Sequence, residues 1–117
     1  MSKIELIKAE TVDNKLINEI IRRIVVIVNP LKIILFGSWA YGKAKKGSDI
    51  DILVVVERSH LPRHKRAVEV YEALTGILIP KDIVVYTPEE IEEWSEVPQA
   101  FITTIVKKGK VIYEKKD

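Results

Sequence analysis

Two short apolar runs, Lys32–Phe36 and Asp49–Val56, constrain the fold of this chain more than any other feature of the sequence. Each contains two isoleucines, and the second also contains three valines. Such branched side chains favour strands, and each run has the length of a buried strand. Glycine and lysine are frequent in the segment between them, residues 37–48, which predicts a short connection containing turns. Two strands that meet through so short a connection predict a sheet of mixed direction.

Helices and further strands are predicted around this pair. An apolar residue recurs every three or four positions over residues 12–28, which predicts an amphipathic helix capped by Thr11 and ended by Asn29-Pro30. A helical turn over 39–43, a turn over 45–48 and a helix with Pro62 in its first turn and Gly76 at its end are predicted next. A strand over Asp82–Tyr86 follows, and then a helix start with a capping box at Thr87-Pro88-Glu89-Glu90. The last predicted elements are a helix over 98–108, with Phe101, Ile102 and Ile105 facing inward and Gly109 as its stop, and a strand over Lys110–Tyr113.

This order of elements predicts one α/β (α+β) domain over residues 1–117, a mixed β-sheet with helices mainly on one face. The absence of cysteine excludes a disulfide framework and a cysteine-ligated zinc site. No apolar run reaches the ~20 residues of a membrane span, and the first residues lack the apolar core of a signal peptide. We therefore expect a cytoplasmic protein with no membrane contact. The net charge of +2 is too small to favour nucleic acid as a partner by itself.

The acidic residues are unevenly divided, with twelve glutamates and five aspartates among seventeen acids. Asp49 and Asp51 are two positions apart on a predicted strand, so both carboxylates point to one face, while Ile50 and Ile52 point to the other. Two such acids repel each other, and a divalent cation relieves that repulsion. Carboxylate oxygens suit Mg²⁺, and this spacing is compatible with two metal ions. The alternative interpretation is a solvated strand edge.

Gly37 and Ser38 follow the first apolar strand. Glycine allows a phosphate to approach the backbone, and amide groups at a helical turn together with the serine hydroxyl form an anion site. Ser38 could instead simply cap a helix. Asp82 begins the third predicted strand, and its carboxylate joins the other two if that strand pairs beside residues 49–56; otherwise it is a turn residue. A phosphate site, two metals and a third carboxylate predict nucleotidyl transfer to an acceptor hydroxyl.

The Gly37-Ser38 turn, ten intervening residues and then Asp49-Ile50-Asp51-Ile52 resemble the signature of the DNA polymerase β-like nucleotidyltransferase superfamily. More narrowly, residues 16–113 resemble the minimal nucleotidyltransferase (MNT) proteins. The resemblance implies that superfamily's fold, ATP or another nucleotide as donor, and Mg²⁺. It also implies that Gly37 and Ser38 bind phosphate, that Asp49 and Asp51 hold metal, and that Asp82 is the third carboxylate.

The same resemblance implies a protein partner. Minimal nucleotidyltransferases resemble the antitoxin of a pair whose other member is a small helical HEPN protein, neutralised by binding or by addition of AMP. We expect such a partner, a homodimer, or both. The alternatives to catalysis are a binding module that acts by contact, with Trp94 or Phe101 as contact residues, and a nucleotide sensor.

Three further features stay open at the level of sequence. Trp39 and Tyr41 either stack on the nucleotide base or pack the loop that carries them, and Tyr41 is retained as a nucleotide-binding candidate. His60 and His64 lie in a basic segment that is either a solvated helix start or a surface for an acidic acceptor such as RNA. Their alternative role as metal ligands has little support.

Overall fold

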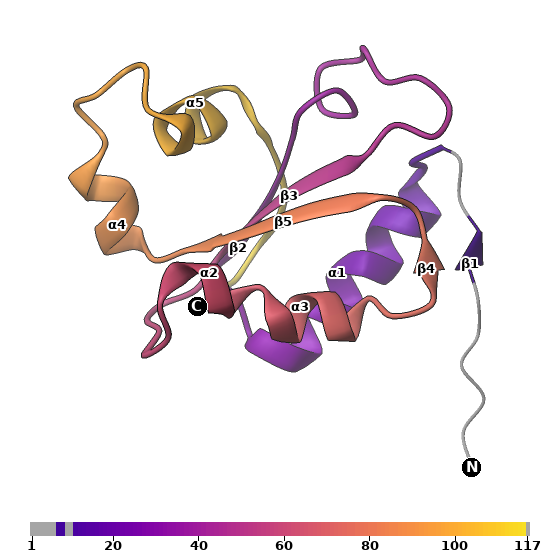
Figure 1. Ribbon diagram of the computed structural model, residues 1–117, viewed down its shortest axis with the longest axis horizontal. Coiled ribbons are helices and arrows are strands. Elements are labelled where there is room, and N and C mark those ends of the chain that lie inside the picture. The colour runs from indigo at the N-terminus through magenta and orange to yellow at the C-terminus, as the bar shows by residue number, and fades with distance from the viewer. Residues whose placement is uncertain (1–6, 9–10, 117) are drawn as a thin grey trace.

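The computed structural model describes residues 7–8 and 11–116, and its centre is a four-stranded mixed sheet (Figure 1). The strand order is β5-β3-β2-β6, so β5 and β6 are the edges. β3 runs antiparallel to β2 and parallel to β5, and β6 runs antiparallel to β2, which confirms the predicted mixed sheet. The strands are β2 (Lys32–Phe36), β3 (Ile50–Val55), β5 (Lys81–Tyr86) and β6 (Lys110–Glu114).

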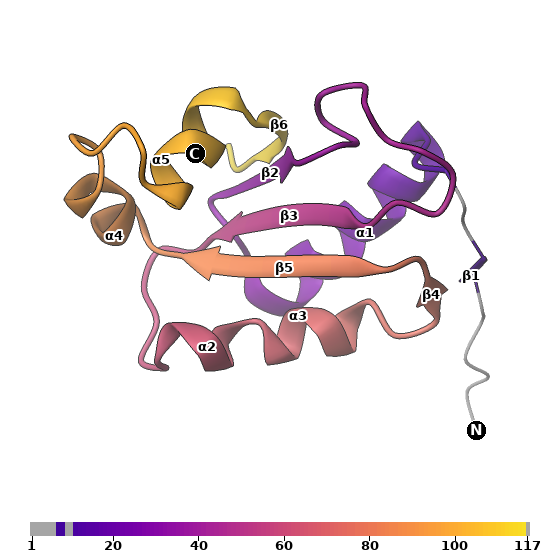
Figure 2. The same cartoon turned by 45° about the horizontal axis from the view of Figure 1, so that its top comes forward.

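Three helices cover one face of this sheet, as predicted (Figure 2). They are α1 (Asn14–Val28), α2 (Arg63–Arg66) and α3 (Val68–Ala73). The apolar stripe of α1 places Ile20 and Ile24 in this layer, almost fully buried. Burial of such side chains contributes roughly 1.5–3 kcal/mol each relative to exposure. The larger core formed here contains Leu16, Ile20, Ile24, Ile33, Leu35, Ile50, Ile52, Val54, Val70, Leu74, Ile77, Ile79, Ile83 and Val85.

A smaller core lies on the opposite face, under α5 (Phe101–Lys108) and beside α4 (Pro88–Glu93). Its buried members are Ile34, Phe36, Leu53, Val55, Ile102 and Ile105. The prediction that Phe101 faces inward is wrong, because Phe101 is the first residue of α5 and its side chain is 56% exposed at the rim of this core. Its ring and that of Phe36 meet edge to face, with centroids 5.8 Å apart.

Several element boundaries differ from those predicted. Asp13, not Thr11, caps α1, because its carboxylate accepts a hydrogen bond from the Leu16 amide at 2.8 Å. Pro62 precedes α2 as its N-cap residue instead of occupying the first turn. The helix predicted from Pro62 to Gly76 is divided at Ala67, whose backbone stays right-handed, so α2 and α3 follow each other closely. Residues 38–42 form turns without a helix.

Two short strands were not predicted. β1 (Ile7–Lys8) and β4 (Ile77–Leu78) pair in parallel as a separate two-stranded sheet. Two-residue strands carry too little periodicity for a sequence pattern to reveal them. None of the helices in residues 7–8 and 11–116 is long and apolar enough to cross a bilayer.

Candidate functional site

Asp51 lies on β3 and faces the side of the sheet that carries the smaller core. Alternation along the strand explains this orientation, because Leu53 and Val55 belong to the smaller core while Ile50 and Ile52 are buried in the larger one. Asp49 is exposed and immediately precedes β3. The predicted separation of carboxylates from isoleucines is therefore confirmed at Asp51.

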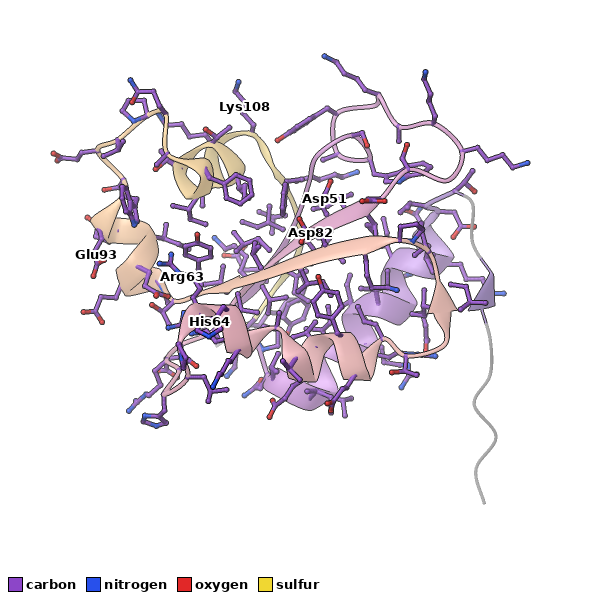
Figure 3. The ribbon with its side chains drawn as sticks, in the orientation of Figure 1. Asp51, Arg63, His64, Asp82, Glu93 and Lys108 are labelled. Carbon is purple, nitrogen blue, oxygen red and sulfur yellow. The ribbon has the colours of Figure 1, made fainter. Side chains whose placement is uncertain are left out.

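The third predicted carboxylate is brought beside the second by strand pairing. Asp51 is the register partner of Asp82 on β5 and, on its other side, of Phe36 at the end of β2. Neighbouring strands lie about 4.8 Å apart. Gly37, Asp51 and Asp82 therefore lie in that order across the sheet, ending at the open edge of β5. Figure 3 shows Asp51 and Asp82 close together beside the loop that follows β2.

Gly37 is held against the carboxylate of Asp51. A side chain at position 37 would overlap the Oδ2 atom of Asp51, and its β-carbon would lie 2.9 Å from Cγ of the same residue. The backbone of Gly37 also has a φ of +72°, a left-handed conformation that other residues rarely adopt. Glycine is thus required here both for its conformation and for the close approach to Asp51.

The loop after Gly37 is organised by its own hydrogen bonds. The amides of Ala40 and Lys43 donate to the carbonyls of Gly37 and Ser38, each at 3.0 Å. Trp39 donates its indole N–H to the Ser48 carbonyl at 2.9 Å and packs against the larger core. Trp39 therefore braces the loop, which is one of the two roles considered for it.

Tyr41 and Ser38 remain accessible from solvent. Tyr41 is 42% exposed, and Ser38 is half-buried. Both lie on the loop that starts beside Asp51, so a nucleotide with phosphates at Gly37 and Ser38 could reach Tyr41. Their roles in nucleotide binding stay predictions.

The three aspartates influence one another electrostatically. Partial burial raises the pKa of Asp51 above its ordinary value, and the negative charges of Asp82 and Asp49 raise it further. Desolvation and like charges both oppose ionisation of a carboxylate. A divalent cation at this position would offset the repulsion, and Mg²⁺ commonly combines one or two carboxylates with phosphate and water ligands. The donor set thus fits Mg²⁺. In residues 7–8 and 11–116, however, no three acidic or histidine side chains already surround a common point.

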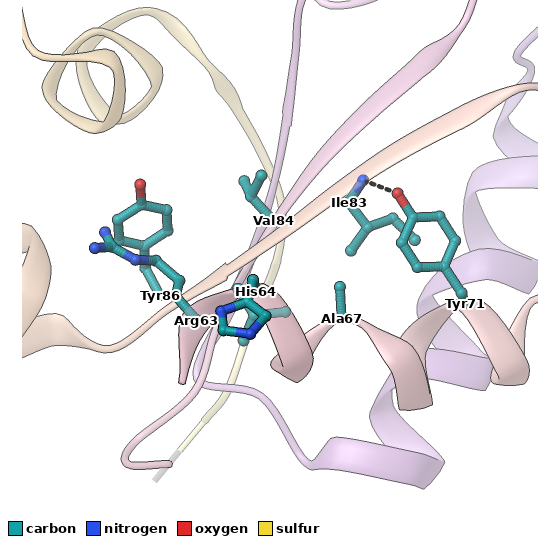
Figure 4. A pocket seen from close by; sticks show the side chains of 8 residues that line it. Arg63, His64, Ala67, Tyr71, Ile83, Val84 and Tyr86 are labelled. Atoms are coloured by element: carbon teal, nitrogen blue, oxygen red, sulfur yellow. Dashed lines mark hydrogen bonds between the residues drawn. The ribbon is translucent and has the colours of Figure 1, made fainter. Parts of the chain in front are cut away.

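A groove of about 660 Å³ runs along the open edge of β5, where α2 and α3 flank the strand (Figure 4). The pattern of the sequence did not reveal it, because it depends on where α2 lies relative to β5. The signal in the sequence that relates to the groove is the two-residue alternation that places Tyr86 on the same face of its strand as Asp82. We name it the β5 groove; it is lined by Arg63, His64, Ala67, Tyr71, Ile83, Val84, Val85 and Tyr86.

Arg66, a further basic residue of α2 near this groove, has structural contacts. Arg66 donates to a carboxylate oxygen of Glu90 at 2.5 Å and to the Leu61 carbonyl at 2.8 Å. His64 lies in the groove and His60 lies outside it, and the described part of the chain places no metal-binding cluster around either.

Residues 18–117 match the family model described as "Polymerase beta, Nucleotidyltransferase". A crystal structure from Sulfolobus solfataricus, titled a "putative nucleotidyltransferase", is similar in fold, with a TM-score of 0.58 and 21% sequence identity. The similarity covers 85% of this chain and 77% of that one. A search of curated proteins finds no match.

Proposed function

The chain belongs to the polymerase beta nucleotidyltransferase family, and from that premise we propose that it transfers a nucleoside monophosphate from a nucleotide to a hydroxyl group on a protein. We take ATP as the donor and AMP as the transferred group, with Mg²⁺ as the metal. Since ATP and Mg²⁺ are abundant in the cytoplasm, we place the reaction there.

One observation carries this proposal, namely the pairing of Asp51 with Asp82 beside Gly37. The pairing aligns a glycine turn with two neighbouring carboxylates across three strands. A glycine at the end of a strand can admit a phosphate, while adjacent carboxylates favour a divalent cation. A nucleotide and its metal can therefore bind next to each other here.

Each residue has a distinct task in the proposed reaction. Gly37 and Ser38 bind the phosphates of the donor, and Tyr41 contacts its nucleoside. Asp49, Asp51 and Asp82 hold up to two Mg²⁺ ions, which when bound offset the charge of the phosphates. Asp82 also accepts the proton of the acceptor hydroxyl. The acceptor oxygen bonds to the α-phosphorus, the bond from that phosphorus to the bridging oxygen breaks, and pyrophosphate leaves.

The acceptor is proposed to belong to a second protein. Asp82 is exposed on the edge strand β5, so its open side is available to a partner. A small helical HEPN-type protein is our candidate, with this chain as its antitoxin. A homodimer could coexist with that complex.

The proposal is tested by replacing Asp51 with Asn and measuring transfer of radiolabelled AMP to co-expressed partner protein. We expect transfer to fall by at least about a hundredfold, the range seen when a charge-stabilising group is removed from an active site. Asp13→Asn is the matched control, because it makes the same change at the cap of α1, which is not one of the proposed site residues. Unchanged transfer in Asp51→Asn would contradict the proposed role of the site.

A second function is favoured by a separate observation. Trp94, Val97 and Phe101 are each more than one-third exposed around the α4–α5 connection. Exposed aromatic residues often anchor protein interfaces. In this alternative, the chain neutralises its partner by contact and the carboxylates only retain a nucleotide site. A nucleotide sensor that binds without turnover is a further form of the same idea.

Neutralisation of the partner separates catalysis from contact. An Asp49→Asn/Asp51→Asn double variant that still neutralises the partner would favour contact, and loss of neutralisation would favour catalysis. The complementary variant Trp94→Ala/Phe101→Ala is expected to abolish neutralisation only in the contact mechanism.

A further inference from the structure

The β5 groove runs along β5 from Ile83, the residue next to Asp82, to Tyr86. Asp82 and Tyr86 lie on the same face of β5, four positions apart. An extended strand rises about 3.3 Å per residue, so these positions are about 13 Å apart. A donor at Gly37 is on the other side of Asp51. An acceptor must therefore approach over β5, and the groove is on that path.

Arg63 marks the far end of the groove. Its guanidinium lies 4.7 Å from the centre of the Tyr86 ring, to which it reaches from α2 past the open edge of the sheet (Figure 4). Among residues 7–8 and 11–116, Arg63 pairs with no carboxylate. The neighbouring Arg66 differs, because Glu90 neutralises it. Arg63 thus retains an unneutralised charge that is oriented by the tyrosine ring.

The strand itself offers backbone groups to the groove. The amides of Ile50 and Val56 donate to Pro80 and Tyr86, so alternate residues of β5 bond to β3 and the remaining ones face outward. Ile83 and Val85 are outward residues, but the Val85 carbonyl already accepts a hydrogen bond from Arg66 at 3.5 Å, so the Ile83 carbonyl and the Val85 amide are the groups that remain for a ligand. The Ile83 amide donates to the Tyr71 hydroxyl at 2.9 Å, which leaves the hydroxyl proton of Tyr71 available to an acceptor group.

These features suit an extended polypeptide better than RNA. The walls formed by Ala67, Ile83, Val84 and Val85 are apolar, and an open strand edge can bind another extended chain through its backbone. RNA recognition commonly uses an accessible aromatic face for base stacking, whereas one face of Tyr86 is occupied by Arg63. Arg63 adds a preference for a negative group through charge-assisted hydrogen bonds.

We propose that the β5 groove binds an extended segment of the protein acceptor and that Arg63 selects an acidic side chain about four residues from the acceptor hydroxyl. The identity of this segment as part of the acceptor rests on the proposed transferase function. Binding of an extended acidic segment in the groove does not depend on that function. Arg63 is a specificity-determining residue, and Tyr86 positions its guanidinium.

The test measures peptide binding to the full chain without ATP or Mg²⁺. The probes are fluorescent, acetylated ten-residue peptides of Ser, Thr and Val with one Tyr and, four residues away, either Glu or Gln. We expect the Glu peptide to bind about tenfold more tightly, the discrimination typical of one charge-assisted pair. Arg63→Gln should remove this difference. Amide chemical shifts should locate the peptide at Ile83–Tyr86.

Lys65→Gln is the matched control, since Lys65 is exposed on the same helix, outside the groove, and the substitution removes the same charge. It should keep the tenfold preference. Equal binding of the two peptides, an equal effect of Lys65→Gln, or tighter binding of a uridine decanucleotide than of the Glu peptide would each overturn the assignment. A separate titration of ATP with Mg²⁺ tests the nucleotide site, so failure of that site can be told apart from failure of the groove.

Discussion

At the scale of single residues, Gly37 and Asp51 depend on each other. The absence of a side chain at position 37 lets the carboxylate of Asp51 lie against the backbone of the turn. The left-handed φ of +72° turns the chain away from β2 at the same point. The turn after β2 and the strand β3 are thereby in direct contact, so a change at either Gly37 or Asp51 is expected to affect both.

Gly37→Ala is expected to destabilise the protein and to weaken ATP binding. The left-handed conformation alone costs roughly 1–2 kcal/mol for alanine, and the collision with Asp51 adds about 1–3 kcal/mol, typical of overpacking. Urea denaturation and ATP titration measure the two effects. Gly42→Ala is the matched control, because Gly42 has the same φ of +72° and no atom within 4 Å of an added β-carbon. Equal losses in free energy of unfolding would show that the contact with Asp51 is unimportant.

Asp51→Asn is expected to stabilise the metal-free protein while it abolishes transfer. Partial burial and the nearby charges of Asp82 and Asp49 oppose ionisation of Asp51, and asparagine removes the charge at similar size. Solvent screens the repulsion because the side chain is only partly buried, so the gain is small, on the order of 0.5 kcal/mol. Thermal unfolding measures it. Addition of Mg²⁺ should raise the melting temperature of the unmodified protein and leave Asp51→Asn unchanged.

At the scale of elements, one ion pair joins α2 to the start of α4. Glu90 accepts hydrogen bonds from Arg66 and from the amide of Thr87, whose hydroxyl in turn accepts from the Glu90 amide. The predicted capping box is confirmed, but the ion pair that Glu90 also forms with Arg66 was not predicted. Local spacing specifies the box, whereas the contact with Arg66 spans twenty-four residues.

Replacement of Glu90 is expected to give graded losses of stability. Glu90→Gln keeps an acceptor for the capping box and loses only the charge, about 1 kcal/mol, while Glu90→Ala loses both, about 2–3 kcal/mol. Urea denaturation at pH 7 measures the series. Glu93→Gln is the control, because Glu93 is exposed on the same helix. A loss from Glu93→Gln as large as that from Glu90→Gln would contradict the role of the ion pair.

The same pair predicts an acid-dependent stability. Partial burial alone would raise the pKa of Glu90, but hydrogen bonds from Arg66 and Thr87 outweigh it and hold the pKa below its ordinary value. A lowered folded-state pKa stabilises the protein above the unfolded-state pKa, near 4.3, and this stabilisation disappears as the pH falls through the folded-state value. The difference in unfolding free energy between the unmodified protein and Glu90→Gln should therefore shrink below about pH 4.

Sequence patterns predicted most elements because their signals are local. Periodicity placed α1, and Gly109 ended α5 as expected, where an added β-carbon would lie 2.5 Å from the Ile105 carbonyl. The errors were of two kinds. The choice between Thr11 and Asp13 as cap depends on backbone geometry, and the exposure of Phe101 depends on where α5 meets the sheet.

At the scale of the whole molecule, the sheet separates two cores of unequal size. The larger one contains α1 and α3, and the smaller one holds α5 above Ile34, Phe36, Leu53 and Val55. The candidate site lies on the side of the smaller core. Elements with few buried contacts open more readily than the rest of a fold. The face that carries Asp51 is therefore expected to be the more dynamic one.

Hydrogen exchange tests this expectation. Amides of α5 should exchange through local opening at a lower free energy than those of α1 and β3. Ile105→Ala, which removes about 2–5 kcal/mol of packing, should accelerate exchange in α5 alone under native conditions. Ile24→Ala, a matched truncation in the larger core, should lower the free energy of exchange throughout the sheet. Uniform acceleration by both variants would indicate one cooperative unit.

The candidate site could be predicted only in part. Asp49 and Asp51 follow from two-residue alternation, and Gly37-Ser38 follows from its place after a strand. The sequence pattern left the neighbour relation of Asp51 and Asp82 conditional, because it requires a parallel pairing across the intervening α2 and α3, and only the family resemblance implied that Asp82 is the third carboxylate. The β5 groove depends on the same crossover, and so it was absent from the sequence-based description.

The order of Gly37, Asp51 and Asp82 across the sheet has a stereochemical consequence. With the triphosphate of the donor held at Gly37 and the acceptor arriving over Asp82, the leaving pyrophosphate and the acceptor oxygen would lie on opposite sides of the α-phosphorus. A single displacement of this kind inverts the configuration of the phosphorus, whereas two successive displacements through a nucleotidylated residue of the protein would retain it. The configuration of a chiral phosphorothioate, compared between the ATP analogue and the product, would thus distinguish a single displacement from two successive ones.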